Sequence, residues 1–136
     1  MIGCSTNRLA STFQLYGEEI SENSDIREHI EIAKDAYDIH HLNIETVPVG
    51  TPLAGMFLMF RKSLWNEVKF EEKSIQFDLI FSDTLHSLNK KLGIARGIYL
   101  FHIYRLGSEN PASSISHIAH CQDFSKVYTP KGANNG

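Results

Sequence analysis

Cysteine is scarce in this chain of 136 residues: only Cys4 and Cys121 occur, far apart and without Cys-x-x-Cys spacing. Two reduced thiols are therefore favoured over a disulfide or a zinc site. No apolar run approaches the roughly 20 residues of a membrane-spanning helix, and the first residues do not form a signal-peptide pattern. These absences predict a cytoplasmic protein with no transmembrane segment.

A large excess of charge of either sign is also lacking. The formal net charge is −3 with histidine neutral, so nothing indicates a nucleic-acid groove or an anionic membrane surface as partner. No P-loop, no G-x-G-x-x-G and no internal repeat is present. The length predicts a single domain with one core. We expect this domain to span residues 1–124 and the tail, residues 125–136, to be disordered.

The clearest helix signal begins near Asp25, where Ser24 or Asp25 can cap the helix and Asp25 with Glu28 has capping-box spacing. Apolar residues then recur at steps of four, three and four, the period of one helix face: Ile26, Ile30, Ala33 and Tyr37. The pattern predicts a helix that runs to His40 or His41. His29 lies too far from His40 to share one metal ion with it, so we interpret these histidines as surface or flanking residues.

Four further stretches are typical of strands. Residues 1–5 form a short apolar opening, and residues 42–47 alternate as in a half-exposed strand. Residues 55–60 and 94–105 are apolar runs that predict strands buried on both faces. A buried helix segment is the alternative for residues 55–60, but their brevity and the leading glycine favour a strand. After this run, Ser63 is placed to cap a short helix that carries Trp65.

A second helix is indicated by Leu85, Leu88 and Leu92, which step by three and four before Gly93. This pattern places Ser82 or Asp83 at or near its N-terminus. A carboxylate there is stabilised by free backbone N–H groups and the helix dipole. Asp83 therefore fits a structural cap, and the same rigid, ionised carboxylate also suits a general base.

The remaining histidines give weak metal signals. His102 ends the apolar run 94–105, and a lone histidine at a strand end is more often structural than a ligand. His117 and His120 lie three apart near Cys121 and have ligand-like spacing, but no third ligand is fixed. The sequence leaves their roles open.

Three stretches occur in an order that resembles a known family. Residues 52–65 fit the form P-x-x-G-x-F-x-x-x-[RK]-[KR]-x-x-[WF], residues 82–93 resemble an acidic helix start that ends in glycine, and residues 97–102 resemble a strand that ends in histidine. Residues 2–8 look like a strand and loop that follow the family's acidic metal motif. Over roughly residues 1–106 the chain resembles the C-terminal half of a family 2 glycosyltransferase with the GT-A fold.

The resemblance implies an α/β fold, a partial GT-A-like fold with a short mixed sheet flanked by helices. It implies transfer of a sugar from a nucleotide-diphosphate sugar to an acceptor hydroxyl of a saccharide or glycan, with inversion, as in hexosyltransferases. Asp83 matches the family's catalytic base, although Ser82 stands where a Glu is common, and His102 matches a position that helps bind Mn²⁺ or Mg²⁺. The acceptor-binding residues implied are Thr51, Pro52, Leu53, Ala54, Gly55 and Trp65.

One departure from the family is an absence. The chain contains no Asp-x-Asp, the motif that holds the donor's metal ion in the family, and the nucleotide-binding βαβ half that precedes it there is missing. We therefore expect a fragment that needs a missing donor-binding half, with self-association through exposed apolar surface. The alternatives are a non-catalytic remnant that binds a sugar or a partner chain, and an unrelated α/β domain whose strands imitate the family by chance.

Overall fold

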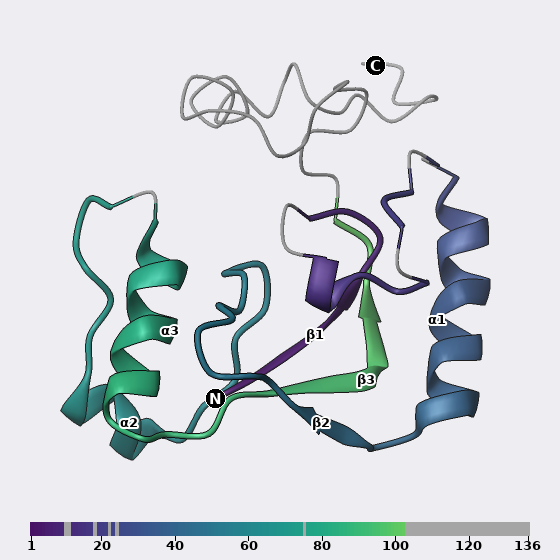
Figure 1. Cartoon of the computed structure of the whole chain (residues 1–136). Coiled ribbons are helices and arrows are strands. Elements are labelled where there is room, and N and C mark those ends of the chain that lie inside the picture. The colour runs from purple at the N-terminus through teal and green to yellow at the C-terminus, as the bar shows by residue number, and fades with distance from the viewer. Residues whose placement is uncertain (10–11, 18, 22, 24, 75, 103–136) are drawn as a thin grey trace.

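The computed structural model describes residues 1–9, 12–17, 19–21, 23, 25–74 and 76–102. Its elements, in chain order, are β1 (Ile2–Thr6), the 3₁₀-helix η1 (Thr12–Gln14), α1 (Ile26–His40), β2 (Ile44–Thr46), α2 (Lys62–Glu67), α3 (Phe77–Ser87) and β3 (Gly93–Leu100). The strands form one sheet in the order β1-β3-β2, with β1 parallel and β2 antiparallel to β3. Figure 1 shows α1 to one side of this sheet and α2 and α3 to the other. The predicted α/β class with a short mixed sheet is confirmed; the predicted tail lies outside the described residues.

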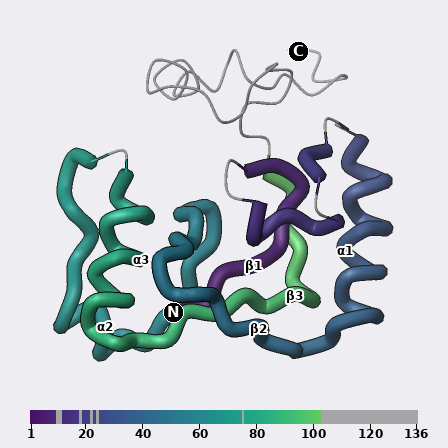
Figure 2. The backbone as a smooth tube through the Cα atoms, viewed as in Figure 1, coloured from purple at the N-terminus to yellow at the C-terminus, as the bar shows by residue number. Residues whose placement is uncertain are grey.

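The central strand β3 turns a corner midway along its length, which is visible in Figures 1 and 2. Its pairing with β1 jumps from Cys4↔Ala95 to Ser5↔Tyr99, so β3 carries extra residues at the bend. Gly97 lies in this bend, where a Cβ atom would overlap the carbonyl oxygen of His41 and lie 3.0 Å from its carbonyl carbon. Only glycine allows the chain that leaves α1 to pass this close to β3.

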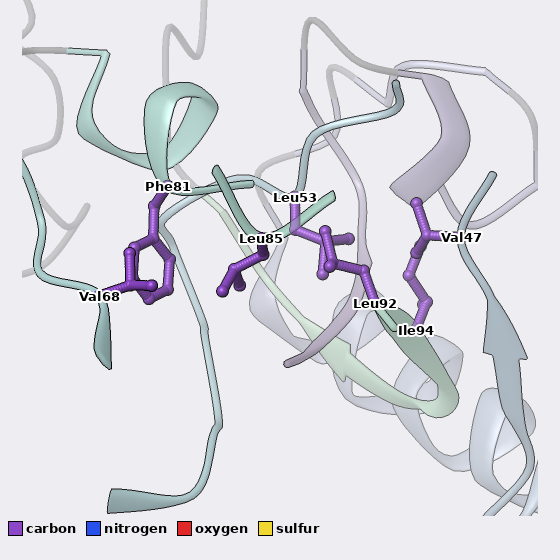
Figure 3. Close-up of a cluster of buried hydrophobic side chains, with 7 residues drawn as sticks. All are labelled: Val47, Leu53, Val68, Phe81, Leu85, Leu92 and Ile94. Atoms are coloured by element: carbon purple, nitrogen blue, oxygen red, sulfur yellow. The ribbon is translucent and has the colours of Figure 1, made fainter. Parts of the chain in front are cut away.

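The hydrophobic core lies between the sheet and α3. It consists of seven buried side chains, shown in Figure 3: Val47, Leu53, Val68, Phe81, Leu85, Leu92 and Ile94. An aromatic cluster continues it toward α2, with ring centroids 4.6 Å apart for Phe70 and Phe81 and 5.3 Å for Trp65 and Phe70. Edge contacts of this kind add to the stabilisation from burial alone. The core therefore joins α3 to the sheet and holds the loop that contains Leu53.

Helix α1 begins and ends as its sequence predicts. Asp25 is the N-cap, and its Oδ1 accepts a hydrogen bond from the backbone N–H of Arg27 at 2.9 Å. The Arg27 side chain also hydrogen-bonds this carboxylate, which lowers the pKa of Asp25 to about 2. The helix ends at His40, next to His41, whose φ of 48° lies in the left-handed region.

The face that α1 packs against the sheet differs from the expected one. An apolar helix face ordinarily packs against the core, yet Ile26, Ile30 and Tyr37 remain 51%, 48% and 50% exposed. The buried positions are instead His29 and Ala36. The interpretation of His29 as a surface residue is therefore wrong.

The burial of His29 is accompanied by partners at both ring nitrogens and by an aromatic ring stacked on the imidazole. Nε2 lies 2.8 Å from the carbonyl oxygen of Asn23, and Nδ1 lies 2.7 Å from the hydroxyl of Tyr99. Since a carbonyl only accepts, Nε2 donates to Asn23 and the Tyr99 hydroxyl donates to Nδ1. The ring also stacks on Phe101 at a centroid distance of 4.1 Å. Satisfied hydrogen bonds make burial of this polar ring tolerable.

Residues 55–60 do not form the predicted strand. Residues 55–57 turn, and within the run only Met59 pairs, in an isolated bridge with Ile2. The run contains no β-branched residue, and Leu58 and Phe60 pack individually against the core. Tertiary packing therefore overrides the apolar pattern. The short helix that follows begins at Lys62, with Arg61 rather than Ser63 as N-cap.

The second long helix begins earlier than predicted. Helix α3 begins at Phe77, so Asp83 is its seventh residue and not its start. It ends at Ser87, and Asn89 follows with a φ of 54°, a left-handed conformation that terminates helices. Gly93 begins β3 rather than ending the helix. The prediction misplaced this helix because the true start has no side-chain cap, and capping is the signal on which such predictions depend.

Candidate functional site

The loop of residues 51–55 is held by a row of side-chain hydrogen bonds. Its backbone N–H groups at Leu53, Ala54 and Gly55 donate to Ser82 Oγ at 3.0 Å, Gln14 Oε1 at 2.8 Å and Asp78 Oδ2 at 2.7 Å, respectively. The carbonyl oxygen of Thr51 lies 3.2 Å from His86 Nε2. Consecutive N–H groups in a loop have no strand partners, so these side chains take the place of a sheet neighbour. These side chains therefore fix the loop in one conformation.

Gln14 connects this loop to the sheet. Its side chain is fully buried. The Nε2 atom donates to the carbonyl oxygen of Cys4 in β1 at 3.1 Å, while Oε1 accepts from Ala54. The sequence carries no signal for this role, because an isolated glutamine in a loop has no pattern. Cys4 itself is a buried free thiol whose pKa is raised to about 11 by burial.

Asp78 lies in the first turn of α3, at the side of the loop. Its Oδ2 accepts the Gly55 N–H, and its Oδ1 accepts the N–H of Leu79 at 2.9 Å. Free N–H groups and the helix dipole favour a carboxylate at this place. The environment that the sequence analysis assigned to Asp83 therefore belongs to Asp78. An acidic residue in the first turn of a helix is a recognised sequence signal, but the helix start was misplaced.

Gly55 is required where the loop meets α3. A Cβ atom at this position would lie 2.8 Å from Cε2 of Phe77 and closer still to Cζ. The absence of a side chain lets the Gly55 N–H approach Asp78 directly. Phe77 in turn packs edge-on against Phe70 at 5.2 Å, so the contact is confined from both sides.

The structure does not bring Asp83 to this loop. Asp83 is exposed midway along α3, while Ser82 and His86 of the same helix contact the loop. Its backbone carbonyl accepts the hydroxyl of Ser87 at 2.9 Å. The expectation that Asp83 begins the helix is wrong, and its role as a base stays a prediction.

His102 follows β3 and lies beside the end of β1. Its backbone N–H donates to Asn7 Oδ1 at 2.7 Å, and its Nδ1 donates to the carbonyl oxygen of Arg8 at 3.0 Å. Burial lowers the pKa of His102, and the hydrogen bond to Arg8 partly opposes this shift. In Figure 1 the end of β3 and helix α3 lie well apart. His102 and Asp83 therefore do not form one site.

The predicted acceptor residues divide into two groups. Five of them form the fixed loop: Thr51, Pro52, Leu53, Ala54 and Gly55. Trp65 lies on α2, 37% exposed, with the Lys69 ammonium 4.4 Å from its ring centroid. Its described ring contacts are with Phe60 and Phe70, so packing accounts for its position.

The described residues do not fit a metal centre on their own. Among them no three His, Cys, Asp or Glu side chains gather closely enough to hold an ion. Beside His102, the Nδ2 atom of Asn7 is buried with no hydrogen-bond partner in the described part of the chain, and an N–H donor does not bind a cation. The expected Mn²⁺ or Mg²⁺ therefore stays a prediction from the resemblance, and no chemical step is derived through it.

Two hollows lie away from the loop. One, of about 760 Å³, is lined by Phe13, Tyr16, His40 and Arg96 among others. The other, of about 860 Å³, is lined by Met59, Arg61, Lys90 and Lys91 among others. Neither is lined by Asp78, Asp83 or His102. Across residues 1–102, apart from the undescribed positions, no helix is long and apolar enough to cross a membrane.

Comparisons with protein families, curated proteins and solved structures find no match for this chain.

Proposed function

We propose that this chain is a glycosyltransferase-like protein that transfers a sugar from a nucleotide-diphosphate sugar to an acceptor hydroxyl with inversion, and that Asp78 is its general base. The sheet with α3 and the 51–55 loop then corresponds to the acceptor side of a partial GT-A-like fold. The order of the three family-like stretches supports this proposal at the level of sequence. A cytoplasmic location, where such donors are made, accompanies it.

The observation that carries the proposal is the hydrogen bond of 2.7 Å between Asp78 Oδ2 and the Gly55 N–H. A general base has to be rigidly aimed at the site where the acceptor oxygen binds. Asp78 is fixed at the head of α3 and touches the loop that the resemblance assigns to the acceptor. Asp83 is exposed on the same helix and lacks both features.

The reaction assigned to Asp78 is a proton transfer coupled to substitution. The acceptor hydroxyl gives its proton to the Asp78 carboxylate while its oxygen attacks the anomeric carbon from the face opposite the leaving group. A new C–O bond forms, the bond to the diphosphate breaks, and the nucleoside diphosphate departs with the bonding electron pair. One inversion results, because one displacement occurs.

A matched pair of variants tests the assignment. The chain, joined to the donor-binding half that the resemblance implies, is incubated with UDP-glucose, UDP-N-acetylglucosamine or GDP-mannose, together with Mn²⁺ and a panel of saccharides, and the released nucleoside diphosphate is measured. Asp78→Asn keeps an acceptor oxygen for the Gly55 N–H but removes the base, so we expect a loss of at least ~100-fold. Asp83→Asn, on the exposed face of the same helix, is expected to stay within about twofold of wild type. If Asp83→Asn lost more activity than Asp78→Asn, Asp83 rather than Asp78 would be the general base.

A second candidate function is a non-catalytic module that binds a saccharide or a partner chain. It is favoured by the absence of Asp-x-Asp from the sequence and of a metal-ligand cluster from the described residues. Calorimetry separates the two candidates. Binding of a nucleotide-diphosphate sugar with Mn²⁺ supports the transferase, whereas binding of saccharide alone, without release of nucleoside diphosphate in the assay above, supports the module.

A further inference from the structure

The face of α1 that the sheet leaves uncovered has a regular spacing of apolar residues. Four positions repeat at steps of four, three and four, forming what we call the α1 stripe: Ile26, Ile30, Ala33 and Tyr37. The three large members remain about half exposed. Steps of four and three are those by which one helix packs along another. The stripe is thus suited to a second helix.

Each residue of the α1 stripe is followed directly by a charged residue. These are Arg27, Glu31, Lys34 and Asp38, and all four are exposed. Because successive residues are turned by about 100° around a helix, the four charges form one row along one flank of the stripe. The other flank contains His29 and Ala36, which precede stripe members and are buried against the rest of the chain. The stripe therefore has a packed side and a charged, open side.

The row of charges is complementary to the same row running in the opposite direction. Its signs alternate from positive at Arg27 to negative at Asp38, at steps of four, three and four. When the row is read from the other end, every position carries the opposite sign. The apolar stripe has the same spacing in both directions. An antiparallel copy of α1 therefore brings unlike charges opposite one another at every position and apolar residues opposite one another along the stripe.

We propose that two copies of this chain associate through their α1 stripes as a symmetric antiparallel helix pair. Its two-fold axis passes near the middle of α1. Ile26 then lies against Tyr37 of the partner subunit, and Ile30 against Ala33 of the partner subunit. Arg27 faces Asp38 of the partner subunit, and Lys34 faces Glu31 of the partner subunit. A symmetric pair of this kind closes on itself and does not grow into a filament.

Within one copy the charged row already has partial pairing. Arg27 binds the Asp25 carboxylate at 2.6 Å, and Lys34 binds Glu31 at 2.7 Å, both on the exposed surface. These pairs contribute little in water, so the apolar stripe supplies most of the affinity and the charges select the antiparallel orientation. From Ile26 to Tyr37 the stripe extends only ~16 Å. This contact is smaller than the roughly 800 Å² per partner of a standard interface, so we expect a dissociation constant on the order of 100 µM.

Sedimentation velocity from about 5 µM to about 500 µM tests the proposal, because this range spans the expected dissociation constant. Wild type is expected to change from monomer to dimer across the series. Ile30→Glu puts a carboxylate in the centre of the apolar contact and is expected to raise the dissociation constant at least ~10-fold. Circular dichroism checks that this substitution, at a half-exposed position, leaves α1 folded.

Ile39→Glu is the matched control. Ile39 is 67% exposed on the same helix, and it is turned by about 200° from Tyr37, away from the stripe. This variant is expected to dimerise like wild type. A charge exchange tests the orientation: Arg27→Glu and Asp38→Lys each weaken the dimer singly, and the double variant recovers it.

Three results would overturn the inference. These are a wild-type monomer throughout the series, an equal loss in Ile30→Glu and Ile39→Glu, or a charge-exchanged double variant that is no stronger than the single ones. Wild-type monomer with intact α1 would mean that a second copy does not cover the stripe. The test is independent of transferase activity, because it measures mass alone.

Discussion

The replacement of Gly55 by alanine is the sharpest test of the fixed loop. The added Cβ would lie 2.8 Å from Cε2 of Phe77 and nearer to Cζ, whereas carbon atoms in contact prefer about 3.5–4.0 Å. The ring therefore has to move by roughly 1 Å. That movement disturbs the edge contact of Phe77 with Phe70, at 5.2 Å, and draws the Gly55 N–H away from Asp78.

The expected loss of stability follows from two opposing terms. Overpacking of this kind costs about 1–3 kcal/mol. Alanine also restricts the unfolded chain, which offsets ~0.4–1 kcal/mol. The net free energy of unfolding is expected to fall by about 1–2 kcal/mol, and the midpoint of thermal unfolding by roughly 3–10 °C.

Urea unfolding followed by tryptophan fluorescence measures this loss, because Trp65 is the only tryptophan in the chain and packs in the adjacent aromatic cluster. Phe77→Leu is the companion substitution, since it removes the ring that the new methyl group meets. In the double variant we expect the Gly55→Ala cost to shrink by at least half, a coupling that independent sites do not show. An unchanged urea midpoint for Gly55→Ala, or simple additivity in the double variant, would refute the reasoning.

Two further predictions concern buried groups on the sheet. Tyr99→Phe removes the hydroxyl that binds Nδ1 of buried His29, and urea unfolding is expected to show a loss of ~1–2 kcal/mol in the free energy of unfolding. The control Tyr16→Phe keeps the neighbouring aromatic ring and is expected to change this free energy little. Equal losses in the two variants would contradict the hydrogen-bond argument. In a Cys121→Ser background, the Cys4 thiol is expected to resist a thiol reagent at pH 8 until the chain unfolds, since burial raises its pKa to about 11. The raised pKa favours the protonated thiol, so this contribution to stability is present below about pH 9, the pKa of an unfolded cysteine, and is lost as the pH rises toward 11; rapid labelling of native chain would contradict it.

Some predictions that depend on neighbouring residues alone are confirmed. Asp25 caps α1 through the N–H of Arg27, a hydrogen bond between residues two apart, so its signal is complete in the sequence. The opening strand and the long apolar run that became β3 are also found, at Ile2–Thr6 and Gly93–Leu100. The longer apolar run became the central strand, between β1 and β2.

The prediction for the start of α3 is wrong because it depends on a contact between residues far apart in the sequence. The head of α3 has no side-chain cap of its own; its carboxylate, Asp78, instead binds the loop at Gly55. That contact joins residues 23 apart, which periodicity does not reveal. The misplaced helix start put Asp83 at the head of this helix, whereas its assignment as the catalytic base came from the family resemblance.

For the candidate site, the sequence alone indicated two of the segments that take part: the loop at residues 51–55 and the helix that became α3. Only the tertiary structure decided which side chains hold that loop, which face of α1 stays open, and that His29 is buried. The physical reason is that capping and periodicity act over one or two helical turns. The energy of burial and of loop hydrogen bonds depends on which partners the fold brings within about 3 Å.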